Sequence, residues 1–192
     1  MQPDKLEEWL AAEAAQRQLN AKGPGPGVAR PEQVAPLDGL AVMQAMLRGE
    51  LPFPLISRTL DFILIEVSHG HAVFQGTPSL AHYNPLGTVH GGWFATLLDS
   101  ALGCSVHTAL PVGKGYTTLE LKVNLIRALT DQVPRVRAEG RVIHVGRQTA
   151  TAEARLVGPD GKLYAHGTTT CLVFDQRPAP RSVPEALPQS PP

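Results

Sequence analysis

The stretch NPLGTVHGGWFATLLDSALG, residues 84–103, decides the fold of this chain. It is rich in apolar residues, and Asp99 is the only formal charge between Glu66 and Lys114. A helix on a protein surface carries charges along its outer face, and this segment does not. The sequence therefore predicts a long helix at about residues 89–109 that is buried on nearly all sides.

Around this helix the chain alternates apolar and polar residues, which is typical of strands with one buried face. Such strands are expected at 59–67, 72–76, 117–125, 135–143, 149–156 and 162–174. In residues 117–125 the inward positions are expected to be Leu119, Leu121, Val123 and Leu125. Turn residues at 146–147 and 158–161 predict antiparallel hairpins. The expected α+β architecture is an antiparallel sheet wrapped around one long central helix.

The two ends of the chain have a different composition. Residues 4–19 predict a helix, and the Gly-Pro run at 23–27 breaks regular structure. We therefore interpret residues 1–35 as a helical extension on a linker, an appendage to the main domain at 36–175. A short helix is expected within that domain at 37–47. The proline-rich residues 176–192 are expected to be a disordered tail.

Composition excludes several classes of protein. Seventeen basic and 17 acidic residues leave no formal net charge, so a nucleic-acid partner is not expected. Two cysteines without a CxxC pair favour a reducing compartment, and we expect a cytoplasmic protein. No secretion signal or membrane-spanning run is recognisable, so no membrane partner is expected. The histidines suggest no metal site, because His69 and His71 lack an evident third ligand.

The start of the long helix resembles an anion-binding site. With Thr88 as the expected N-cap, the first-turn amides have no intrahelical acceptor, and the helix dipole favours negative charge there. Gly91 and Gly92 allow a ligand close to the backbone. Asp99 is a candidate catalytic carboxylate, because burial of an unpaired charge is unfavourable. Each feature alone is equally compatible with an ordinary helix start or with a carboxylate satisfied at a solvent gap.

Spacing along the helix predicts an oligomer. Gly91 and Asp99 lie eight positions apart, which is about 12 Å along a helix axis. One carbonyl carbon cannot contact both within one chain, so a shared reaction requires a site between two chains. Gly103, one turn beyond Asp99, is expected to leave room for substrate or for the partner.

Residues 84–92 and 98–103, together with the string GYTTLELKVN at 115–124 and the lead-in AMLRGELP at 45–52, closely resemble PaaI-like (phenylacetate-pathway) hotdog thioesterases. The resemblance covers about residues 37–174. It implies a hotdog fold and a homodimer, or a homotetramer built as a dimer of dimers. It also implies hydrolysis of an acyl-CoA thioester to a free acid and coenzyme A, without a cofactor.

The resemblance also implies roles for individual residues. Asp99 would be the general base or nucleophile, and the Gly91 amide would polarise the thioester carbonyl. His90 would contact the substrate, and Asn84 would hold the water or the carbonyl. The expected substrate-binding residues are Gly92, Gly103 and Arg147, the last for coenzyme A. Some relatives carry Thr or Ser where this chain has Gly103, so a non-catalytic acyl-CoA sensor on the same fold stays an alternative, and a hotdog dehydratase a weaker one.

Overall fold

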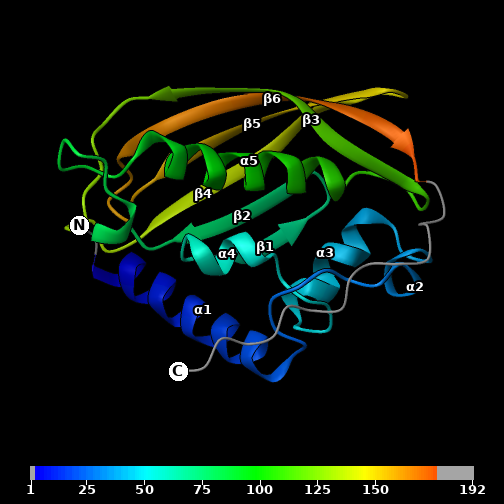
Figure 1. The fold of residues 1–192 in the computed structure, drawn as a ribbon, viewed down its shortest axis with the longest axis horizontal. Helices are drawn as coiled ribbons and strands as arrows, with labels where there is room; N and C mark the ends of the chain where they lie inside the picture. Colours follow the sequence, from blue (N-terminus) through cyan, green and yellow to red (C-terminus); the bar gives the residue numbers. More distant parts are fainter. Residues whose placement is uncertain (1–2, 177–192) are drawn as a thin grey trace.

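The structure is a computed structural model that describes residues 3–176. One central helix packs against a single antiparallel sheet, and the other helices gather at one edge of the sheet (Figure 1). The helices are α1 Pro3–Lys22, α2 Pro31–Val34, α3 Gly39–Leu47, α4 Leu55–Thr59 and α5 Gly91–His107, with a 3-10 turn η1 at Leu80–His82. The strands are β1 Phe62–Ser68, β2 His71–Gly76, β3 Lys114–Leu125, β4 Val136–Val145, β5 Thr149–Val157 and β6 Leu163–Asp175.

The six strands lie in the order β1-β2-β4-β5-β6-β3, and every neighbouring pair is antiparallel. The hairpins β4–β5 and β5–β6 follow the predicted turns at 146–147 and 158–161. The strands after α5 do not form a simple meander, because β3 pairs with β6 and not with its sequence neighbour β4. β3 therefore forms an edge of the sheet, opposite the edge formed by β1.

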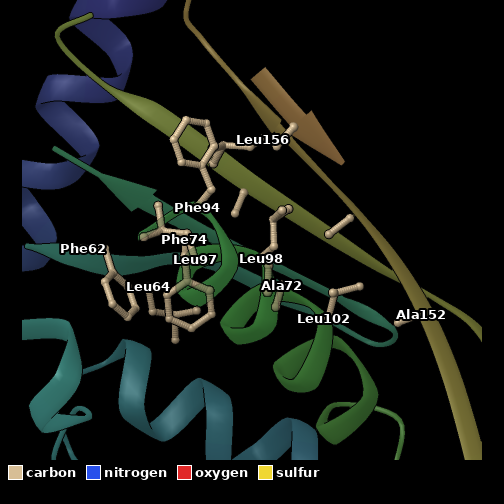
Figure 2. Packing of buried hydrophobic residues seen from close by; sticks show 14 of the residues in the cluster. Phe62, Leu64, Ala72, Phe74, Phe94, Leu97, Leu98, Leu102, Ala152 and Leu156 are labelled. Carbon is tan, nitrogen blue, oxygen red and sulfur yellow. The ribbon is translucent and has the colours of Figure 1, made fainter. Parts of the chain in front are cut away.

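The predicted wrapping of the sheet around the long helix is confirmed. Helix α5 contacts β2, β3, β4, β5 and β6, and its residues Leu97, Leu98 and Leu102 have no exposed surface (Figure 2). Burying each such side chain contributes about 1.5–3 kcal/mol. Gly140 on β4 permits the contact, because a Cβ there would lie 2.2 Å from the carbonyl oxygen of Ala101.

The strand alternation is confirmed in β5 but interrupted in β3. In β5 the side chains of Ala150, Ala152, Ala154 and Leu156 are all buried. In β3 the register shifts between Thr118 and Glu120, so that Leu119 bulges out and is 61% exposed. The inward prediction for Leu119 and Leu125 is wrong, since both are exposed. Because a bulge changes which face a residue occupies, Tyr116 and Thr118 point toward α5 instead.

Helix α1 is not a loose appendage. It lies across β1 and β2 on the side away from α5, and Trp9 is only 2% exposed (Figure 1). The buried Gln75 on β2 donates to the Trp9 carbonyl at 3.1 Å and to Glu13 Oε2 at 2.8 Å. Glu13 also pairs with Arg135 and with Arg17. Burial opposes ionisation of this carboxyl, but the hydrogen bonds from Arg135, Arg17 and Gln75 hold its pKa below the ordinary value.

The glycine-proline segment after α1 is also attached to the domain. Gly27 donates to the carbonyl of Phe53 at 2.9 Å, and Phe53 donates to the carbonyl of Gly25 at 3.2 Å. Gly23 passes so close to Gly49 that a Cβ at position 23 would lie 2.3 Å from its carbonyl oxygen. The predicted tail at 176–192 falls, after its first residue, outside the described residues. Within residues 3–176, no helix combines the length and the apolar composition that crossing a bilayer requires.

Candidate active site at helix α5

Helix α5 begins two residues later than expected, and its N-cap is His90, not Thr88. The backbone of His90 is extended, with φ −62° and ψ 137°, and its Nδ1 accepts a hydrogen bond from the Gly92 amide at 2.9 Å. A nitrogen that accepts from an amide carries no proton, so neutral His90 has its proton on Nε2. The exposed ring of His90 can therefore donate outward through Nε2.

The amide of Gly91 is the open donor at this helix start. It is the first residue of α5, and within residues 3–176 the structure gives its N–H no acceptor. The next amide, that of Gly92, is occupied by His90, and that of Trp93 donates to the His90 carbonyl at 2.9 Å. The positive end of the helix dipole reinforces this single free N–H. The arrangement suits a developing oxyanion.

Asn84 holds the loop that leads into the helix. Its Oδ1 accepts from the amides of Leu86 at 2.9 Å and Thr88 at 3.3 Å, and its Nδ2 donates to Thr88 Oγ1 at 3.0 Å. These bonds explain why Thr88 is not the N-cap, since its hydroxyl accepts a hydrogen bond from Asn84 within the loop. One hydrogen on Nδ2 stays without an acceptor within the described part of the chain, and only this hydrogen is left for a substrate or a water.

Asp99 lies on the side of α5 that faces β3 and is half-buried. Thr118 Oγ1 donates to Asp99 Oδ1 at 3.2 Å, whereas Oδ2 has no hydrogen-bond partner among residues 3–176. Sequence reasoning missed Thr118, because the alternation was extended through the bulge at Leu119. The available signal was the adjacent pair Thr117 and Thr118, just before the alternating residues 119–125. One carboxylate oxygen is thus held and the other is open.

The expectation that Gly103 leaves room for substrate or a partner is wrong within this chain. A Cβ at Gly103 would lie 2.8 Å from the hydroxyl oxygen of Tyr116, so the tyrosine occupies that space. The ring of Tyr116 packs against His107 with centroids 5.6 Å apart. Burial raises the pKa of Cys104 to about 12, so this thiol stays protonated and is no nucleophile. The space one turn beyond Asp99 is therefore filled by the Tyr116 side chain.

Arg147 lies apart from these groups, exposed in the β4–β5 turn. The structure gives it no acidic partner within residues 3–176. Four residues paired side by side on neighbouring strands connect this turn with the hydrogen-bond partner of Asp99. They are Val145 on β4, Ala150 on β5, Cys171 on β6 and Thr118 on β3. Three strand spacings separate the ends of this strand row by about 14 Å. A long ligand could span that distance, whereas a small acyl group could not.

One chain does not bring Gly91 and Asp99 to a common point, since both lie on α5 eight residues apart. Both, however, contact the edge strand β3. A Cβ at Gly91 would lie 3.0 Å from Leu125 Cδ1, and Asp99 is bonded to Thr118. Leu125 is 55% exposed on that edge. The open backbone edge of β3 therefore connects the two halves of the candidate site.

Comparison with known proteins agrees with this architecture. The model of the Thioesterase superfamily matches residues 86–165. The crystal structure of a phenylacetic acid degradation-related protein from Ralstonia eutropha JMP134 superposes with a TM-score of 0.61 at 30% identity, covering 67% of this chain and 97% of that one. The residues matched by the family model include all of α5, β3, β4 and β5.

Two relatives are similar in sequence. A protein from Halobacterium salinarum that is named as an esterase is 37% identical over 88 residues, which are 45% of this chain and 56% of that protein. This match spans about half of the relative's length. The 1,4-dihydroxy-2-naphthoyl-CoA hydrolase of Listeria monocytogenes is 25% identical over 122 residues, 64% of this chain and 98% of that enzyme. With the sheet, the central helix and these matches together, the chain belongs to the thioesterase superfamily, in its PaaI-like group of hotdog proteins.

Proposed function

We propose that this protein hydrolyses an acyl-CoA thioester to a free acid and coenzyme A. The observation that carries the proposal is that α5 offers both a free amide at its start, Gly91 N–H, and an open carboxylate oxygen on Asp99. Thioester hydrolysis needs a donor for the oxyanion and a base or nucleophile for the carbonyl carbon. The activity named for the Listeria relative supports a coenzyme A ester as the substrate class.

The site lies between two copies of the chain. If two β3 edges pair antiparallel about a two-fold axis near residues 121–122, Thr118 of one copy faces Leu125 of the other. Asp99 of one chain then lies near Gly91 of the second chain, and two equivalent sites result. The exposed apolar side chains of Leu119, Leu125 and Ile126 along this edge favour such burial.

The reaction follows from these positions. Asp99 takes a proton from a water molecule as the water attacks the carbonyl carbon, and the Gly91 N–H of the other chain stabilises the oxyanion. The C–S bond then breaks, and the sulfur of coenzyme A takes the proton from Asp99. Direct attack by Asp99 Oδ2, with an anhydride that water later opens, is the second route. Single turnover in ¹⁸O-water separates the two routes, because the anhydride opened at the Asp99 carbonyl leaves ¹⁸O in the protein.

Thr118 is a positioning residue in this scheme, since it contacts Asp99 and not the substrate. Its hydroxyl holds Oδ1 and leaves Oδ2 without a hydrogen bond among residues 3–176. This role takes the place of the hydroxyl that some relatives carry one turn after the acid, where this chain has Gly103. Arg147 is free to bind a phosphate of coenzyme A at the far end of the strand row.

The test is release of free thiol from a panel of aryl- and alkanoyl-CoA esters. We expect wild type to turn over at least one ester and Asp99→Asn to lose turnover while keeping its thermal unfolding temperature. Ser100→Ala is the matched control, because Ser100 Oγ donates to the Thr96 carbonyl at 2.8 Å. Normal turnover by Asp99→Asn would overturn the mechanism.

A non-catalytic acyl-CoA sensor is the second candidate. The observation that favours it is that Tyr116, not a hydroxyl-bearing side chain of α5, occupies the space one turn beyond Asp99. A sensor binds acyl-CoA esters without releasing thiol. Calorimetric binding with no turnover in wild type, across the whole panel, would select this reading over the hydrolase.

A further inference from the structure

A cavity of about 670 Å³ lies between the end of α1, the segment 23–26, α4 and the start of β1. Its volume falls within the range of about 300–1,000 Å³ that is typical of small-molecule sites. None of its lining residues belongs to α5 or β3, so it is separate from the Asp99 site. Helix α1 of the N-terminal extension forms one of its walls.

The floor of this cavity is apolar. Phe62, Phe74 and Leu64 line it from the edge of the sheet, and Met46 and Phe53 line it from the preceding segments. Phe62 and Phe74 are only 3% and 1% exposed and pack edge to face with centroids 5.8 Å apart. The apolar surface that a ligand can contact is therefore that of the half-buried Met46 and Phe53. Such a floor accepts the body of an aryl or short alkyl compound.

One polar group in the cavity lacks a protein partner. Ser57 lines the cavity and is only 5% exposed, yet its hydroxyl has no hydrogen bond within residues 3–176. No fully buried side-chain polar atom of the described residues lacks a partner, so this hydroxyl keeps contact with open space. Because Ser57 is otherwise covered, that open space is the cavity. A ligand atom in the cavity would supply the hydrogen bond that this hydroxyl lacks within residues 3–176.

The charge around the cavity defines the ligand further. Arg17 and Asp61 form an ion pair at 2.7 Å in the wall, and they balance each other. Arg58, next to Ser57 on α4, has no acidic partner within the described part of the chain. One uncompensated positive charge suits a monoanion better than a dianion such as a phosphate monoester.

We propose that this cavity binds a monocarboxylic acid with an aryl or short alkyl body. The carboxylate lies at Arg58 and accepts from the Ser57 hydroxyl, and the body lies against Met46 and Phe53. The geometry of planar guanidinium and carboxylate groups favours this pairing. The assignment is independent of the thioesterase proposal, because it uses no residue of the Asp99 site.

Calorimetric titration of the full chain with 4-phenylbutyrate tests the proposal, with 4-phenylbutanol as the neutral probe. We expect saturable binding of the acid, and we expect the alcohol to bind at least roughly tenfold more weakly. Arg58→Gln should raise the Kd for the acid roughly tenfold or more, and Ser57→Ala should raise it severalfold. Arg155→Gln, an equal charge change at an exposed site on β5, should leave the Kd unchanged.

A second variant locates the ligand without removing a polar contact. Ala21 is exposed at the mouth of the cavity, and Ala21→Trp should block entry and abolish binding. Asp99→Asn should bind the acid as wild type does. The proposal is overturned if the acid does not saturate, if Arg58→Gln and Ala21→Trp bind normally while folded, or if Asp99→Asn abolishes binding.

Discussion

Replacing Thr118 with valine removes one hydroxyl from β3 and keeps the branched shape of the side chain. The lost interaction is the bond from Thr118 Oγ1 to Asp99 Oδ1 at 3.2 Å. Hydrogen bonds to charged groups contribute about 1.5–3 kcal/mol, and this long one belongs at the lower end, about 1.5 kcal/mol. Since about 1.4 kcal/mol changes a rate tenfold, we expect kcat to fall about tenfold with little change in KM.

The assay is steady-state thiol release on the best acyl-CoA of the panel. Thr117→Val is the matched control, because Thr117 is exposed and precedes Thr118 on the other face of the strand. Thr118→Ser keeps the hydroxyl and should recover most of kcat. In an Asp99→Asn background, Thr118→Val should lower residual turnover no further. Equal kcat for Thr118→Val and Thr117→Val, or no recovery by serine, would refute the positioning role.

Three further predictions concern the scaffold. Glu13→Gln should lower the free energy of unfolding by about 1.5–3 kcal/mol, because it removes the charged acceptor of the half-buried Arg135; urea unfolding measures this. Since the pKa of Glu13 is depressed in the folded state, its contribution is present above the unfolded value of 4.5 and is lost as pH falls through the folded pKa, so wild type and variant should converge in acid. Gly103→Ala should destabilise by about 1–3 kcal/mol through its contact with Tyr116, and adding Tyr116→Phe should recover part of that loss in thermal unfolding; no recovery would mean that the hydroxyl is not the obstacle. Leu125→Asp should shift sedimentation to a monomer and abolish turnover together, whereas an active monomer would contradict a shared site.

The parts of the fold that follow from local patterns could be predicted from the sequence. The absence of charge around Asp99 located α5, and the strict alternation in β5 located a strand with one buried face. The glycine turns located the hairpins. The crossing of β3 to the far edge of the sheet is not local, because it depends on which strand pairs with β6 after α5 has packed.

The errors share a physical origin in contacts between distant residues. His90 and Thr88 are both able to cap a helix, and the choice is made by Asn84, which engages the Thr88 hydroxyl. Thr118 was missed because a single bulged residue, Leu119, exchanges the two faces of β3. From the sequence alone, Glu13 resembles a surface charge on a helix. Its burial depends on the ion pair with Arg135, and helical periodicity does not predict that contact.

The bond between Glu13 and Arg135 joins residues 122 positions apart, and that separation has a consequence during synthesis on the ribosome. At about 5–20 residues per second, Arg135 is polymerised roughly 6–24 s after Glu13. Most of the stability of a helix in a protein comes from packing of its apolar face, and α1 leaves the ribosome long before the surface on which it packs exists. During that interval Trp9 is exposed to chaperones and to proteases. Docking of α1 on the sheet is therefore expected to be a late step in the folding of this protein.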